Sequence, residues 1–159
     1  MTSKPFTTCL WFDNQGEAAA QFYTGIFKDS AITGVTRYTE AGPGQAGTVM
    51  TVEFTLNGQN FLALNGGPHY TFSPAVSIVV EAADQAEVDY YWDRLTEGGT
   101  PVACGWVTDK YGLSWQVVPT AFYVMMRDPD PAKVARVTAA MLRMKKFDVS
   151  ELERAYAGQ

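Results

Sequence analysis

The 159-residue chain has few of the side chains that build metal centres and disulfide frameworks. It contains one histidine, His69, and two cysteines, Cys9 and Cys104, which do not form a CxxC pair. A structural zinc site takes about four nitrogen or sulfur ligands, so an ordinary Cys/His zinc centre is excluded. Two thiols in a chain without a secretory signal are expected to be free and buried.

Positive charge and long apolar runs are also scarce. The chain has 12 Lys and Arg residues and 17 Asp and Glu residues, which gives a formal net charge of -5. Because nucleic-acid binding requires basic side chains that neutralise phosphates, no nucleic-acid partner is expected. Apolar runs such as residues 76–80 are far shorter than the ~20 residues that span a bilayer, and no apolar signal core follows residues 1–5. We therefore expect no membrane partner and a cytoplasmic location.

A strand followed by an amphipathic helix is predicted near the start of the chain. Hydrophobic residues make up 47% of the sequence and charged residues 18%, which is enough for a core in a globular domain. A strand at 8–12 precedes Asn14, which is predicted to cap a helix together with Glu17. Apolar residues then recur every fourth position over 18–26, which is typical of a helix with one buried face.

The same pattern returns in the second half of the chain. A strand at 76–81 precedes Asp84 and Glu87, a second capping pair, and a helix that ends at Gly98. Further strands are predicted at 32–39, 48–56, 59–64, 101–107 and 113–118. Asn57 and Gly58 favour a type I′ hairpin turn. We therefore predict an α+β fold of two βαβββ modules, each about 60 residues long.

The last part of the chain has a different character. Prolines and aspartates at 128–131 predict a helix start, an apolar stripe follows, and a short helix is predicted from Ser150. We expect a duplicated domain over 1–127 and a helical extension over 128–159 that packs on the same domain or on a partner subunit. A homodimer is predicted because an exposed stripe would form an unusually large apolar patch. The stripe consists of Val134, Val137, Met141 and Met144.

Four stretches carry a resemblance to a known family. They are LWFD (10–13) with FY (22–23), ALNGGP (63–68), CGW (104–106) with DKYGLSWQ (109–116), and AMLRMKK (140–146). The chain resembles the PhnB-like branch of the glyoxalase/bleomycin-resistance/dioxygenase (vicinal-oxygen-chelate) superfamily, which some databases label 3-demethylubiquinone-9 3-methyltransferase. The resemblance implies that the two modules form a curved mixed sheet around a cavity.

The resemblance also implies four metal-ligand positions, but here they hold Thr8, Ala63, Ser77 and Gln116. Of these, Gln116 alone could offer a weak oxygen ligand, so no metal and no cofactor are expected. The methyltransferase label is not supported, because a dinucleotide-like cofactor fold needs a glycine-rich turn after its first strand. The turn at 13–16 has one glycine.

Strand alternation and the resemblance together predict a set of residues that line the cavity. A wall of hydroxyls, amides, aliphatic groups and a tryptophan suits a small, partly apolar organic molecule. The alternative is that Thr8, Ser77 and Gln116 hydrogen-bond one another inside a filled core. The predicted lining consists of Thr8, Leu10, Phe12, Ala63, Asn65, Ser77, Val79, Trp106, Ser114 and Gln116.

Two function classes remain open at this point. The first is a metal-free protein that binds a small molecule, and the second is a metal-independent lyase, isomerase or transferase. His69 is the obvious general-base candidate for an enzyme, but a lone histidine in a loop after Gly-Gly-Pro is more often an exposed residue without a catalytic role. Asp109 and Lys110 are read as a solvated turn, and no catalytic residue is assigned.

Overall fold

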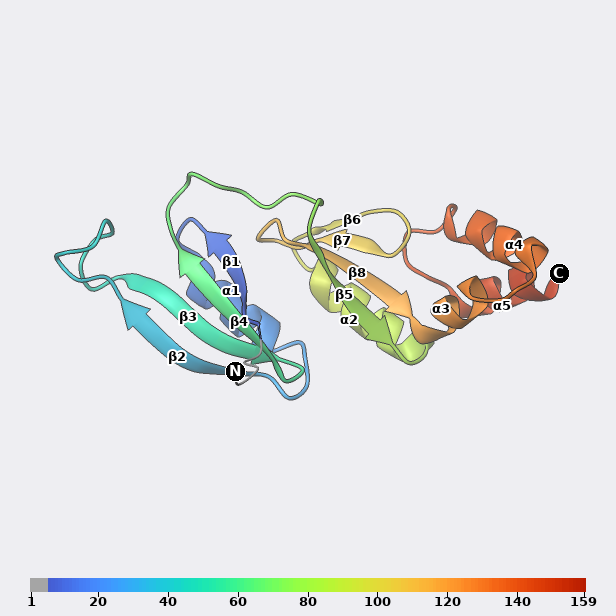
Figure 1. Ribbon diagram of the computed structural model, residues 1–159, viewed down its shortest axis with the longest axis horizontal. Helices are drawn as coiled ribbons and strands as arrows, with labels where there is room; N and C mark the ends of the chain where they lie inside the picture. Colours follow the sequence, from blue (N-terminus) through green and yellow to red (C-terminus); the bar gives the residue numbers. More distant parts are fainter. Residues whose placement is uncertain (1–5) are drawn as a thin grey trace, which may run out of the picture. The chain divides into compact units, whose positions relative to one another are not determined.

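The computed structural model describes residues 6–159 and divides the chain into two compact units, with the boundary after Phe72. Each unit contains one four-stranded sheet and a helix packed on it (Figure 1). The expectation for residues 1–5 lies outside the described part of the chain. Within residues 6–159, no helix is long and apolar enough to cross a membrane.

The first unit is a βαβββ module with strand order β1-β4-β3-β2. β1 runs parallel to β4, and the other neighbouring strands are antiparallel. The helix packs on the sheet through Ala19, Ala20 and Tyr23, whose side chains are fully buried. The elements are β1 (Thr8–Phe12), α1 (Gly16–Thr24), β2 (Ala31–Arg37), β3 (Val49–Leu56) and β4 (Gln59–Asn65).

The second unit repeats this topology with strand order β5-β8-β7-β6. β5 is parallel to β8, and the helix packs on the sheet through Val88, Trp92 and Leu95. The predicted duplication is therefore confirmed. The elements are β5 (Ser77–Ala82), α2 (Gln85–Thr96), β6 (Thr100–Pro101), β7 (Trp106–Thr108) and β8 (Ser114–Pro119).

The turns and caps explain why the elements begin and end where they do. Asn57 and Gly58 have φ values of 48° and 74°, as the predicted type I′ turn requires. The Asp84 side chain accepts a hydrogen bond from the Glu87 amide at 3.0 Å, so the second capping prediction is also confirmed.

The prediction that Asn14 caps the first helix is wrong. Gln15 occupies the cap position without a side-chain cap bond, and the Gly16 amide donates to Asn65 Oδ1 at 2.7 Å. Asn65 belongs to β4, so a buried first-turn amide of this helix, which has no partner within the helix, is satisfied by a side chain of the sheet. Local sequence patterns cannot reveal a cap that comes from 49 residues away.

The C-terminal residues fold onto the second unit of their own chain. Of the predicted apolar stripe, Val137 and Met144 are buried, while Val134 and Met141 are half-buried. In this chain the stripe residues belong to the second compact unit, and the homodimer stays a prediction. The helices are α3 (Thr120–Met126), which the sequence did not predict, α4 (Pro131–Met141) and α5 (Val149–Ala157).

Both cysteines are free, as predicted. Cys104 is half-buried, but Cys9 is exposed on β1, so the expectation that both are buried is wrong. Partial burial still raises the pKa of the Cys9 thiol, which keeps it protonated at neutral pH.

Candidate functional site

One face of the second unit's sheet packs against α2, and α2 leaves the opposite face uncovered. Along β5, Val80 and Ala82 are buried beneath α2, so Ser77 and Val79 point to the opposite side. The strand register places Ser77 beside Ser114, Val79 beside Gln116, and Gln116 beside Trp106. We call the resulting surface the second-sheet face. It contains five of the predicted lining residues, namely Ser77, Val79, Trp106, Ser114 and Gln116.

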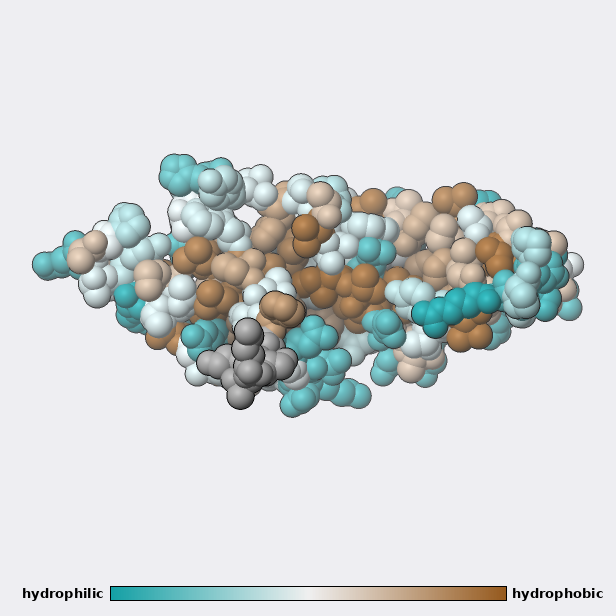
Figure 2. Space-filling view, in the orientation of Figure 1, coloured by the Kyte–Doolittle hydropathy of each residue, from teal (hydrophilic) through white to brown (hydrophobic). Residues whose placement is uncertain are grey.

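A polar pair lies in the middle of this face. Gln116 Nε2 donates to Ser77 Oγ at 2.9 Å, and within residues 6–159 neither side chain makes another hydrogen bond. The Gln116 carbonyl oxygen can therefore accept a bond from a ligand, and the Ser77 hydroxyl can donate one. Val79 is 44% exposed beside them. In the space-filling view, hydrophobic side chains gather over β5 and β8 (Figure 2).

The predicted lining residues of the first unit lie elsewhere. Leu10, Phe12, Ala63 and Asn65 are buried beneath α1 and form the core of the unit. Thr8 is exposed at the start of β1. The strand alternation is thus offset by one residue from the prediction. The other face of this sheet, which we call the first-sheet face, contains Cys9, Trp11, Leu62 and Leu64.

Trp11 is the main feature of the first-sheet face that the sequence reasoning missed. Its indole nitrogen donates to the Gly67 carbonyl at 2.9 Å, and Tyr70 packs edge-on against it with ring centroids 5.0 Å apart. A methyl group on residue 66 would lie 2.3 Å from the Trp11 indole, so only glycine fits at this position without a shift of the ring. His69 is exposed in the same loop, and no described residue orients its ring.

Asp109 was predicted to lie in a solvated turn, and this prediction is wrong. The residue is 3% exposed and accepts hydrogen bonds from the Tyr111 and Leu113 amides at 2.8 and 3.1 Å. Its second oxygen accepts from the Trp115 indole at 2.8 Å. The carboxylate therefore organises the turn before β8 from inside the unit. The aspartate placed before a glycine turn is a signal that could have suggested this role.

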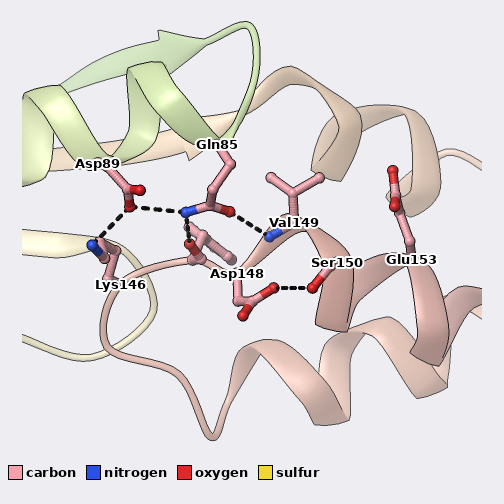
Figure 3. A pocket seen from close by; sticks show the side chains of 8 residues that line it. Gln85, Asp89, Lys146, Asp148, Val149, Ser150 and Glu153 are labelled. Carbon is pink, nitrogen blue, oxygen red and sulfur yellow. Dashed lines mark hydrogen bonds and ion pairs between the residues drawn. The ribbon is translucent and has the colours of Figure 1, made fainter.

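A cavity of about 610 Å³ lies where α2 meets the C-terminal helices (Figure 3). The Gln85 amide spans it, donating to Asp89 and to the Phe147 carbonyl and accepting from the Val149 amide at 2.8 Å. Lys146 pairs with Asp89 at 2.7 Å. Hydrogen bonds from Lys146 and Gln85 lower the pKa of Asp89, so the carboxylate stays ionised. These groups bind one another, and their bonds across the cavity hold the C-terminal helices against α2.

Comparison with known proteins identifies the family. The family model described as 3-demethylubiquinone-9 3-methyltransferase matches residues 4–118. A PhnB protein from Bacillus cereus is 37% identical, with a TM-score of 0.66, and the match covers 74% of this chain and 100% of that one. This chain belongs to the PhnB-like family. The predicted resemblance to the PhnB-like family is therefore confirmed. No curated protein matches this PhnB-like chain.

More distant structures share the fold alone. Protein PA1353 from Pseudomonas aeruginosa is 18% identical, with a TM-score of 0.61, over 74% of this PhnB-like chain and 98% of its own length. The fosfomycin resistance protein FosX from Mesorhizobium loti is 14% identical, with a TM-score of 0.51, over 74% and 92% of the two chains. The family model ends before α3, so the three C-terminal helices lie beyond it.

The metal-ligand positions that the family resemblance implies do not fit an ion in this PhnB-like protein. Ala63 has no donor atom and is buried against α1, where a methyl group on Gly16 would lie 3.1 Å from it. Ser77 and Gln116 bind each other, and Thr8 offers a single hydroxyl. Within residues 6–159, no group of three or more His, Cys, Asp or Glu side chains is placed to hold a metal ion.

Proposed function

We propose that this PhnB-like protein binds a small, partly apolar organic molecule on the second-sheet face, without a metal or another cofactor. The observation that carries the proposal is the Gln116–Ser77 pair, which lies among apolar side chains on a face that α2 leaves uncovered. Small-molecule sites are mostly apolar and contain a few polar groups that fix orientation.

Four residues of the face have a role in this binding. The Gln116 carbonyl oxygen accepts a hydrogen bond from the ligand, while the Ser77 hydroxyl donates one. Val79 and the Trp106 ring contact the apolar part, and a tryptophan offers a large rigid surface at a low cost in conformational entropy. The ligand is therefore expected to carry both a hydrogen-bond donor and an acceptor next to an apolar group.

A second candidate function, a metal-independent enzyme, has one specific observation in its favour. Glu81 follows Ser77 and Val79 in the same alternation on β5 and is exposed. It lies about 7 Å along the strand from Val79, within reach of a small bound molecule. A carboxylate there could act as a general base. Simple binding remains the preferred function, because no nucleophile on the face is paired with this carboxylate.

Native mass spectrometry of the purified protein tests the binding proposal. Wild-type protein is expected to retain a small molecule, and Ser77→Trp is expected to lose it while remaining folded, because the indole fills the face. Ala86→Trp is the matched control, since it places the same side chain on the exposed side of α2.

Unchanged retention in a folded Ser77→Trp protein would place the site elsewhere. If the retained molecules are chemically unchanged when the protein releases them, the result supports binding without catalysis. If the mass of the bound molecule changes with time in the wild-type protein but not in Glu81→Gln, the result would instead support a metal-independent enzyme.

A further inference from the structure

The connection between β6 and β7 is a tight turn with an unusual conformation. Cys104 and Gly105 have φ values of 57° and 79°, and the Trp106 amide closes the turn on the Ala103 carbonyl at 3.1 Å. Two central residues with positive φ define a type I′ turn. A cysteine rarely adopts this left-handed conformation, so the surrounding structure must hold it.

The C-terminal segment provides that support. The Cys104 amide donates to the Met144 carbonyl at 2.8 Å, and the Gly105 amide donates to the Lys145 carbonyl at 2.7 Å. In an ordinary hairpin these outward amides would face water. Here the segment that follows α4 accepts both of them, so the turn and the segment are joined by backbone bonds that do not depend on side-chain identity.

Phe147 completes the contact. Its ring is 2% exposed and packs against Phe122 with centroids 5.1 Å apart. A methyl group on Gly105 would lie 2.5 Å from this ring and 2.8 Å from the Val117 carbonyl. The Gly105 carbonyl also accepts from the Val117 amide of β8 at 2.8 Å. The turn is thus enclosed between the C-terminal segment and the strand that carries Gln116.

Trp106 is the residue directly after this turn, and it lies beside Gln116 on the second-sheet face. We propose that Met144, Lys145 and Phe147 are positioning residues that hold Trp106 against the bound ligand. The C-terminal helices, which lie beyond the family model, would then set how tightly this face binds. This inference rests on the proposed function, because it assigns a binding role to Trp106.

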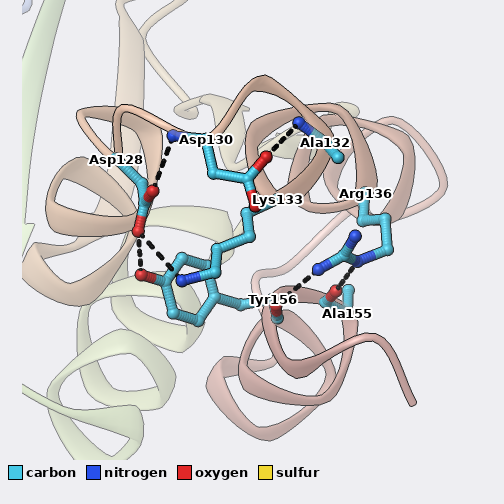
Figure 4. A network of polar contacts seen from close by, with 7 residues as sticks. All are labelled: Asp128, Asp130, Ala132, Lys133, Arg136, Ala155 and Tyr156. Carbon is cyan, nitrogen blue, oxygen red and sulfur yellow. Dashed lines mark hydrogen bonds and ion pairs between the residues drawn. The ribbon is translucent and has the colours of Figure 1, made fainter.

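The C-terminal helices have a second attachment that serves as a control. The Tyr156 hydroxyl donates to Asp128, and Arg136 donates to the Ala155 and Tyr156 carbonyls at 2.9 Å (Figure 4). This network joins α4 and α5 to the end of α3 and includes no residue of the turn. Tyr156→Phe therefore perturbs the C-terminal helices without touching the contact at Gly105.

Fluorine NMR of protein labelled with 5-fluorotryptophan tests the inference directly. The chain has four tryptophans, and the Trp106 signal is assigned by its loss in Trp106→Phe. In Phe147→Ala the Trp106 signal is expected to shift or broaden, while the signals of buried Trp92 and Trp115 report that the unit is folded. Tyr156→Phe should leave the Trp106 signal in place. If Phe147→Ala does not fold, Phe147→Leu makes the same comparison with a smaller loss of volume.

Binding of the neutral dye Nile red supplies the second readout, because the chain carries a net charge of -5 that would repel anionic dyes. Phe147→Ala or Phe147→Leu should weaken dye binding by about fivefold or more, and Tyr156→Phe should not. An unchanged Trp106 signal in the Phe147 variants would overturn the inference. Dye binding that is unaffected by Trp106→Ala would instead overturn the proposed site, while the fluorine signal still decides whether Phe147 positions Trp106.

Discussion

Asp109 shows how one buried carboxylate can determine a local structure. It accepts bonds from two backbone amides of its own turn and from the indole of Trp115, a residue that is 1% exposed. The bonds connect the turn to the core beneath α2, so the position of β8 depends on this residue. Since β8 carries Ser114 and Gln116, the geometry of the second-sheet face depends on it as well.

Asp109→Ala is expected to destabilise the protein strongly. Each buried donor that is left without a partner costs about 1–3 kcal/mol, and the substitution removes the partner of three donors, so a loss of several kcal/mol is expected. Urea unfolding followed by circular dichroism measures the change. Lys110→Ala is the control, because an exposed surface substitution is expected to change stability by no more than about 0.5 kcal/mol. Equal stabilities of the two variants would contradict the role assigned to Asp109.

Single residues were the hardest features to predict from the sequence. Asp109 was predicted to be solvated because aspartates in turns usually are, and the sequence does not show that the indole of Trp115, six residues further along the chain, donates to it. Asn65 was assigned to the cavity, yet it caps α1 from β4. Both roles depend on contacts that the chain makes only after it folds, so spacing along the sequence does not reveal them.

Among the helices and strands, the turns and caps that depend on a few neighbouring residues could be predicted from the sequence. The Asn57–Gly58 turn and the Asp84 cap follow from the conformational preferences of the residues themselves. The buried face of β1 could not be read in the same way, because a strand with the sequence TCLWF has no charged side chain to mark the exposed side. The resulting offset by one residue moved the predicted lining of the first unit from one face to the other.

The C-terminal helices are expected to loosen in acid. Three aspartates attach or cap them, and hydrogen bonds lower the pKa of each below its ordinary value. Asp89 is bonded mainly by Lys146, Asp128 mainly by Tyr156, and Asp148 mainly by Ser150. A carboxylate with a lowered pKa in the folded state stabilises that state above its unfolded pKa of about 3.9. This contribution is lost as the pH falls below about 4 and through the folded pKa values.

Amide hydrogen exchange at pH 7 and pH 3, corrected for intrinsic rates, checks this expectation. Protection of α4 and α5 should fall more than protection of the sheet in the first unit. Asp148→Asn should reduce the difference, because asparagine also caps helices but does not titrate. An equal loss of protection in all elements would mean that the acid effect is not located in the C-terminal helices.

For the whole molecule, the family and the duplicated topology could be predicted because they depend on patterns repeated over many residues. The structure also places five of the predicted lining residues on one face, since β5, β7 and β8 continue the expected alternation. That these residues line a binding site stays a prediction. The homodimer remains a prediction, but its original reason is weaker because Val137 and Met144 of the apolar stripe are buried within the chain, while Val134 and Met141 are half-buried. The first-sheet face provides a new reason. Trp11, Leu62 and Leu64 form an apolar surface that no helix of their unit covers, and such patches often mark interfaces between proteins.

Light scattering at micromolar concentration tests this dimer, and two matched substitutions locate its interface. The intact chain is expected to have the mass of a dimer, and Leu62→Arg is expected to give a monomer, because a charge on the first-sheet face would be buried without a partner. Leu142→Arg is the control, since Leu142 is 64% exposed on the C-terminal helices and is not expected to contribute. A monomeric mass for the intact chain would refute the dimer. If Leu142→Arg alone gave monomers, the C-terminal helices would hold the dimer after all, through their exposed side.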